Sequence, residues 1–317
     1  MRPDELATVC RRTLLCAAAA CSVPMANRAT AAGGALAGDD LAQRMGSTRL
    51  TPPERFASVP AEVRFPSWLA GTWQVTNTAV GLQTPLGRRF VDPYILSVAQ
   101  RDVGSKSTME YQLRFIEDGD ASSPMPVRQD RPFNSIEEEG ALVASRGVVI
   151  ERGDYKMDAS YPHGRVLLEL KDEQLDRVAS AELPKGSPFN VRRVVRTQLE
   201  LETVWAQWQD GSTNGNANAF FTSELMVQRV LLPLTTAPRE AKRERVLDAS
   251  YLEILTRFER SPADMAGTPP TRLRARNRVV QYLSLPGVSE PAAALEVEAA
   301  GRAVLLLDYD WDLRRLV

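Results

Sequence analysis

Side chains able to act as nucleophiles, proton carriers or metal ligands are scarce in this chain of 317 residues. The single histidine, His163, lies between a proline and a glycine in a predicted turn. The three cysteines fall at the start of the chain, at Cys10, Cys16 and Cys21. Structural zinc needs four Cys or His ligands, and a serine or thiol triad needs an imidazole base. The sequence therefore predicts no metal, no cofactor and no His- or Cys-based catalysis, and it leaves a Ser–Lys or paired-carboxylate site open.

Composition excludes further classes of protein. Apolar residues make up 44% of the chain, enough for a packed core. The net charge is −1, with basic and acidic residues interleaved, so the clustered positive field that nucleic-acid binding requires is missing. The apolar runs are too short to span a bilayer. We expect a soluble domain with no nucleic-acid partner.

Residues 1–31 have the features of a cleavable export signal. Arg11 and Arg12 precede a short alanine-rich stretch, and Ala29-Thr30-Ala31 supplies a small-residue cleavage site. The paired arginines favour the twin-arginine route, which exports folded proteins. A general secretory signal is the alternative, and lipidation at Cys21 is a weaker one. Residues 32–64 are predicted to be a flexible lead-in with a short helix near 39–45.

Alternation of apolar and polar residues predicts strands along most of the remaining chain. In the clearest case, residues 108–117, Met109, Tyr111, Leu113 and Phe115 alternate with polar side chains. Another strand begins at Thr72, and the others are predicted at 94–101, 142–150, 166–170, 191–208, 220–232, 251–259, 272–283, 295–298 and 304–316. Loops are predicted at 118–132 and 210–218, and helices of at most a few residues at 180–184 and 238–245.

This pattern favours an all-β domain over residues 65–317. Closing the sheet on itself removes its exposed edges, and a barrel of eight or more strands can enclose a ligand. We predict a single antiparallel lipocalin-like barrel of roughly 8–10 strands with few short helices.

The motif Gly71-Thr72-Trp73 stands at the start of the first predicted strand and resembles the Gly-x-Trp mark of lipocalins and fatty-acid-binding proteins. The resemblance implies that Trp73 closes one barrel end, that Gly71 lets the chain turn in without a Cβ clash, and that an arginine of the last strand stacks on the indole. Arg314 is the candidate, with Arg315 as the alternative. An ordinary buried tryptophan is the simpler interpretation.

A longer series of motifs is similar to a plant, algal and cyanobacterial family of thylakoid-lumen proteins. The series comprises Phe65-Pro66-x-Trp68-Leu69-x-Gly71-Thr72-Trp73, Thr84-Pro85-Leu86-Gly87, Leu113-Arg114-Phe115-Ile116, Asp130-Arg131-x-Phe133-Asn134 and the ending Tyr282-Leu283 to Asp308-Tyr309. That family has a lipocalin-like (calycin) domain of unknown function. The resemblance implies a chloroplast thylakoid-lumen location, or a periplasm-like compartment in a prokaryote, and it carries over no catalytic residue.

Three groups of residues are candidates for recognition. Asp130, Arg131 and Asn134 form either a polar patch at a barrel mouth or, as we favour, a structural set of ion pair and turn cap. Arginines alternate from Arg272 to Arg278 on one strand face, either to meet anionic groups or, slightly favoured, to pair with acidic residues such as Glu200 and Glu202. The candidates for lining a ligand pocket are the aromatic residues Trp73, Tyr111, Phe115, Trp205, Tyr282 and Tyr309.

The favoured function is non-catalytic binding of a small apolar or amphipathic molecule, such as a lipid, pigment or fatty-acid derivative, by apolar burial with a polar anchor. The alternative is an assembly or stability factor that binds a thylakoid membrane complex through its surface. An enzyme resembling lipocalin-type isomerases or de-epoxidases is a third reading, which the scarcity of His and Cys disfavours.

Overall fold

The computed structural model describes residues 41–53, 63–91, 93–117, 125–144, 155–158, 165–170, 196–208, 218–233, 244–260, 269–283 and 302–316. Its strands are β1 (Gly71–Gln83), β2 (Thr108–Glu117), β3 (Val127–Gln129), β4 (Tyr155–Asp158), β5 (Arg165–Leu170), β6 (Arg196–Trp208), β7 (Ala219–Pro233), β8 (Glu244–Arg260), β9 (Arg272–Tyr282) and β10 (Ala303–Leu316). The helices are α2 (Leu41–Gly46), α3 (Pro93–Ser105) and α4 (Arg131–Ala144), with single 3-10 turns η2 (Ser67–Leu69) and η3 (Arg88–Phe90).

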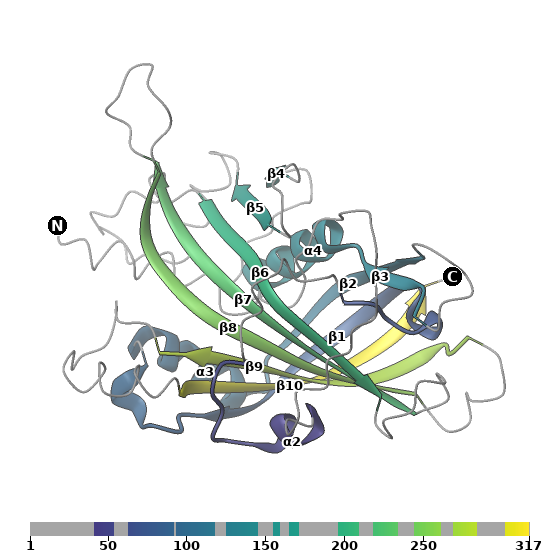
Figure 1. The fold of residues 1–317 in the computed structure, drawn as a ribbon, viewed down its shortest axis with the longest axis horizontal. Coiled ribbons are helices and arrows are strands. Elements are labelled where there is room, and N and C mark those ends of the chain that lie inside the picture. Colours follow the sequence, from purple (N-terminus) through teal and green to yellow (C-terminus); the bar gives the residue numbers. More distant parts are fainter. Residues whose placement is uncertain are drawn as a thin grey trace, which may run out of the picture.

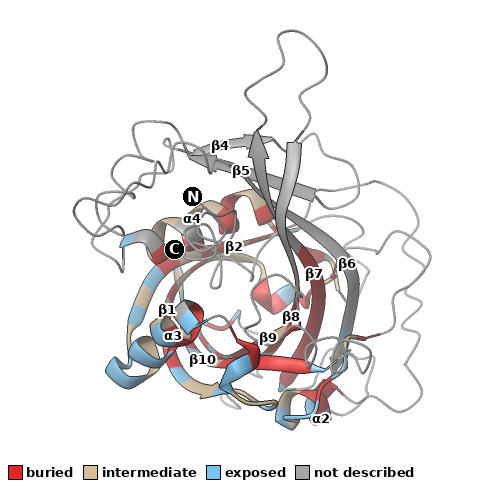
Figure 2. Cartoon of the chain, turned by 90° about the vertical axis from the view of Figure 1, so that its left-hand side faces the viewer, coloured by how far each residue is buried: buried red, intermediate tan, exposed pale blue. Residues whose placement is uncertain are grey.

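The ten described strands form one antiparallel sheet in the order β3-β2-β1-β10-β9-β8-β7-β6-β5-β4. The sheet curls into a half-barrel, with β1, β10, β9, β8 and β7 following one another around the wall and α4 beside β2 (Figures 1 and 2). The predicted all-β barrel fold with few short helices is confirmed. The predicted strand at 295–298 and helix at 180–184 lie outside the described residues.

The curl brings strands that are far apart in the sheet into contact across its concave face. Phe115 on β2 and Phe258 on β8 meet with ring centroids 6.1 Å apart, although three strands separate them in the sheet. Phe65 contacts both rings and also Phe220 on β7, at 6.0 Å. These four side chains, here called the phenylalanine cluster, are at most 2% exposed and fill the concave face near the start of β1. Apolar burial of this kind is what holds the curled sheet together.

Residues 41–53 lie on the opposite, convex face of the sheet. The predicted short helix near 39–45 is present as α2, but the segment is anchored rather than a flexible lead-in. Leu41 and Leu50 pack in a buried cluster with Phe221, Leu225 and other outward-facing residues of β7–β10. The Leu50 carbonyl also accepts a hydrogen bond from the Ala303 amide, 2.9 Å away. The domain therefore includes this segment.

One segment predicted as a strand is helical, and so is the described start of a second. Residues 94–101 belong to α3, because Pro93 fits a first helical turn and the buried residues Ile95, Leu96 and Ala99 recur at helical spacing. The start of the 142–150 strand is the end of α4, while 145–150 lie outside the described residues. The predicted 118–132 loop contains β3 and the first turn of α4. The predicted 238–245 helix overlaps the start of β8.

The arginine row of β9 pairs with its neighbour β10, whereas Glu200 and Glu202 belong to β6, which β8 and β7 separate from β9. Arg278 binds Asp308 at 2.5 Å and Arg272 binds Asp312 at 2.5 Å. Arg276 lies 3.9 Å from Asp310. The Arg272 guanidinium lowers the pKa of Asp312 below its usual value. Because each of these arginines pairs with an aspartate of β10 on the outer surface, the arginine row is one side of a cross-strand charge ladder.

Candidate ligand-binding site

Trp73 lies at the start of β1 and is fully buried. Its Nε1 donates to the Leu69 carbonyl at 2.7 Å, and the Arg315 guanidinium carbon lies 4.6 Å from the ring centroid. Arg315 also donates to the carbonyls of Trp68 (2.9 Å), Ala70 (2.5 Å) and Pro270 (3.0 Å). One side chain thus ties the η2 turn and the start of β9 to the last strand, and it covers the indole.

The stacking arginine is Arg315, and the prediction of Arg314 is wrong. Side chains alternate along a strand, so Arg315 shares the concave face with Leu313 and Trp311. Arg314 points outward with a 70% exposed side chain, 3.8 Å from Asp312. Desolvation lowers the pKa of Arg315 from its usual value.

Gly71 permits this approach, because its φ is +113° and an added Cβ would lie 2.9 Å from Arg315 Nη1. We expect Gly71→Ala to destabilise the protein by about 2–4 kcal/mol, combining left-handed strain with displacement of Arg315. Gly87→Ala is the matched control, because Gly87 also has a positive φ, +97°, but has open space around its Cα. Urea unfolding measures both, and an equal loss in the two variants would contradict a steric role for Arg315.

Beyond the phenylalanine cluster, the concave wall carries a band of buried polar groups, here called the interior polar band. On β9 and β8, Asn277 Nδ2 donates to Thr256 Oγ1 at 2.9 Å, and Thr256 is the register partner of Thr222 on β7. On β1 and β2, Asn77 Nδ2 donates to the Tyr111 hydroxyl at 3.3 Å. The band consists of Asn77, Tyr111, Thr222, Thr256, Asn277 and Trp311.

Two atoms of this band have no hydrogen-bond partner among the described residues: Asn77 Oδ1 and Trp311 Nε1. Asn77 is 6% exposed and Trp311 is 4% exposed. Their Cα atoms are direct register partners across β1 and β10, so the side chains are neighbours on one face. Buried polar groups are nearly always paired, and leaving one unpaired costs about 1–3 kcal/mol. This pair therefore offers one donor and one acceptor to a bound molecule.

The three residues of the predicted polar patch, Asp130, Arg131 and Asn134, all make contacts that stabilise the fold. Arg131, 0% exposed, binds Glu224 on β7 through both terminal nitrogens, at 2.6 and 2.9 Å. Asp130 binds Arg114, and its Oδ1 accepts from the Phe133 amide at the start of α4. Asn134 does not cap a turn. Its Oδ1 accepts from the Arg114 amide at 2.7 Å, and its Nδ2 donates to the Arg114 carbonyl at 3.2 Å. The three residues attach α4 between β2 and β7.

The predicted pocket aromatics do not all share one face. Trp73, Tyr111, Phe115 and Tyr309 belong to the buried cluster of the concave face. Tyr282 belongs to the convex-face cluster, since it is out of phase with the inward residues of β9. It is therefore not a residue of the interior. Trp205 lies on β6, and its side chain is outside the described residues.

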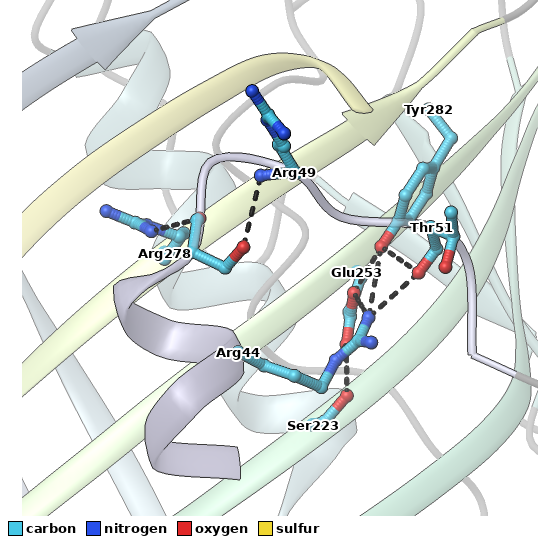
Figure 3. A network of polar contacts seen from close by, with 8 residues as sticks. Arg44, Arg49, Thr51, Ser223, Glu253, Arg278 and Tyr282 are labelled. Atoms are coloured by element: carbon cyan, nitrogen blue, oxygen red, sulfur yellow. Dashed lines mark hydrogen bonds and ion pairs between the residues drawn. The ribbon is translucent and has the colours of Figure 1, made fainter. Parts of the chain in front are cut away.

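On the convex face, Tyr282 takes part in a buried charge network with Arg44 of α2 (Figure 3). Arg44 Nη2 lies 2.7 Å from Glu253 Oε2, with side chains 7% and 0% exposed. Ser223 Oγ donates to Glu253 Oε1 at 2.7 Å, and the Tyr282 hydroxyl donates to Glu253 Oε2. The Thr51 carbonyl accepts from Arg44 at 3.0 Å. This set, here called the convex network, joins residues 44–51 to β7, β8 and β9.

We expect the convex network to make the stability of the protein sensitive to alkaline pH. Burial, followed by the Glu253 carboxylate, raises the pKa of Tyr282 above its ordinary value of 10.0. The protonated Tyr282 contributes its full stabilisation below about pH 10. Above that pH the free energy of unfolding declines, because the phenol ionises in the unfolded chain but stays protonated in the folded protein. Tyr282→Phe should make the decline between pH 10 and 12 shallower, by up to about 1.4 kcal/mol per pH unit.

Urea unfolding at several pH values measures that slope. Tyr251→Phe on β8 is the control and reports what the loss of a different phenol contributes. A Tyr282→Phe slope no shallower than that of Tyr251→Phe would contradict the role given to Tyr282.

Several key residues were not predicted from the sequence. Asn77 could have been found, because it alternates with Trp73, Val75 and Ala79 on one face. Glu224 and Glu253 could not, since their partners Arg131 and Arg44 are 93 and 209 residues away in sequence. In the described parts of the chain, no group of three or more His, Cys, Asp or Glu side chains is placed to hold a metal ion. Within the same parts, no helix combines the length and apolar character needed to cross a membrane.

Comparison with known proteins yields one match. No curated protein and no solved structure is significantly similar to the chain. A family model described as a domain of unknown function, DUF6816, matches residues 57–317, which include all ten described strands. The chain belongs to the DUF6816 family.

Proposed function

We propose that the protein is a non-catalytic, lipocalin-like binding protein of the thylakoid lumen that holds a small apolar or amphipathic molecule, such as a lipid, pigment or fatty-acid derivative, against its concave wall. The observation that carries the proposal is the unpartnered donor and acceptor of Trp311 and Asn77 beside the apolar and aromatic residues of the concave face. Ligand sites of this kind combine an apolar lining with a few placed polar groups. The location is supported by the twin-arginine motif and by the resemblance to thylakoid-lumen proteins.

The described surface does not favour the alternative of a factor that assembles membrane complexes. Its exposed large hydrophobic residues are Val80 and Leu316. They lie near opposite ends of the paired strands β1 and β10, so they form no shared patch. A contiguous apolar patch of the kind that marks many protein interaction sites is therefore not seen among the described residues.

Native mass spectrometry of the protein purified from its own cells tests the proposal. We expect a stoichiometric apolar molecule, released on unfolding. Ala275→Phe should reduce its occupancy, because Ala275 is buried on the concave wall as the register partner of Trp311 and Phe258. Arg276→Phe, one residue along and outward-facing, is the matched control and should retain the ligand. An empty protein that co-purifies with a membrane complex would overturn the proposal and support the alternative.

A further inference from the structure

The unpartnered polar pair of the concave wall has a definite hydrogen-bonding character. The indole Nε1 of Trp311 can only donate. The amide Nδ2 of Asn77 is engaged with the Tyr111 hydroxyl, which leaves Oδ1 as an acceptor. A ligand group that satisfies both must accept one hydrogen bond and donate another at adjacent positions.

We infer that this pair recognises a neutral hydroxyl group, so that the ligand is an alcohol with an apolar chain. A hydroxyl oxygen accepts from the Trp311 N–H, and its own hydrogen is donated to Asn77 Oδ1. A carboxylate, ketone or ether oxygen can only accept, and an ammonium group can only donate. The inference rests on the proposed function and specifies its ligand.

The charges on the concave side agree with a neutral ligand. Arg131 and Arg315 both reach this side, but Arg131 holds Glu224 through two hydrogen bonds and Arg315 donates to three carbonyls. A carboxylate would compete with these contacts and would place a negative charge beside the Asn77 oxygen. Desolvating an unpaired charge costs more than desolvating a neutral hydroxyl.

Most of the neighbours of the pair on the concave wall are apolar. On the Trp73 side, the phenylalanine cluster packs the concave face, and Phe258 meets the Trp311 ring at 6.4 Å. On the other side, buried apolar residues continue along the wall toward α3, whose side chains join the same cluster: Ala79, Val279, Leu307, Ile95, Leu96 and Ala99. An apolar chain attached to a hydroxyl at the pair would have these residues as its nearest neighbours on the α3 side.

A displacement assay tests this recognition. Three ligands with the same dodecyl chain length compete with the neutral fluorescent probe N-phenyl-1-naphthylamine. The ligands are 1-dodecanol, dodecyl methyl ether and dodecanoate. The wild-type protein should bind the alcohol roughly fivefold more tightly than the ether, the factor expected for one net hydrogen bond. Asn77→Leu should remove this discrimination, whereas Trp311→Phe should weaken alcohol and ether alike by roughly fivefold.

Trp68→Phe is the matched control for the indole. Trp68 is also buried and its Nε1 also has no hydrogen-bond partner. It lies in η2, outside the interior polar band, and the guanidinium carbon of Arg260 lies 5.2 Å from the centroid of its ring. If Trp68→Phe, and not Trp311→Phe, weakened binding, the assignment would be overturned. Circular dichroism establishes that each variant is folded.

The outcomes separate this inference from the proposed function. If the probe binds and the three ligands displace it equally, the protein binds apolar molecules but does not recognise a hydroxyl. The same holds if the alcohol is preferred equally by wild type and both variants, since water then satisfies the pair. If neither probe nor ligands bind, the proposed function fails together with the inference.

Discussion

Arg131→Met should destabilise the protein by about 3–5 kcal/mol, because it leaves Glu224 as an unpaired charge in the interior. Arg131 is 0% exposed and Glu224 is 3% exposed, so water cannot replace the lost guanidinium. Methionine keeps much of the arginine stem, and the loss is therefore mainly that of the charge and its two hydrogen bonds. The measurement is the free energy of unfolding in urea.

A second variant decides whether charge is the cause. Arg131→Met combined with Glu224→Leu removes both charges and should recover most of the stability, since an apolar replacement of a buried pair is often neutral. Arg272→Met removes an arginine from the exposed charge ladder and should leave the midpoint nearly unchanged. A double variant as unstable as the single one would show that Arg131 acts through packing alone.

The second large effect is expected on the convex face. Arg44→Met should cost about 3 kcal/mol or more, because Glu253, with 0% of its side chain exposed, loses its cationic partner and keeps the neutral donors Ser223 and Tyr282. Because the variant also unties α2 from β8, trypsin should cleave faster after Arg49, an exposed residue of the same segment.

Gln43→Met is the matched control, because Gln43 lies next to Arg44 on α2 but is exposed to solvent. It should change neither the stability nor the rate of cleavage after Arg49. Unchanged cleavage in Arg44→Met would mean that the apolar contacts of Leu41 and Leu50 hold the segment without the convex network.

Alternation along the chain was sufficient to predict most of the sheet. β2 has the predicted bounds, and β9 and β10 differ from them by one residue. The same rule, followed along β10, selects Arg315 over Arg314, because Trp311, Leu313 and Arg315 share a face. In 94–101 the apolar residues Ile95, Leu96 and Ala99 fit a helix better than a strand, but short apolar runs are ambiguous without tertiary context.

The start of α4 carries local sequence signals of a helix. Asp130 precedes Pro132, and an acidic N-cap followed by proline is typical of a first helical turn. The contacts that fix α4 and α2 in place were not predictable, because Arg131 and Arg44 meet carboxylates on strands brought near only by the curl of the sheet. The interior pair Asn77–Trp311 likewise depends on the register between β1 and β10.

The position of β10 has a consequence for biosynthesis. The strand contributed by the C-terminal part of the chain lies between β1 and β9, so it joins the earliest strand to the later ones. While the ribosome is still making residues 303–316, the paired strands β1 and β2 and the β6–β9 meander lack the strand that links them in the sheet. Contacts that span so many residues form late and slowly. The domain should therefore reach its native state only after residues 303–316 have been synthesised, and the edge of β1 that pairs with β10 stays open until then.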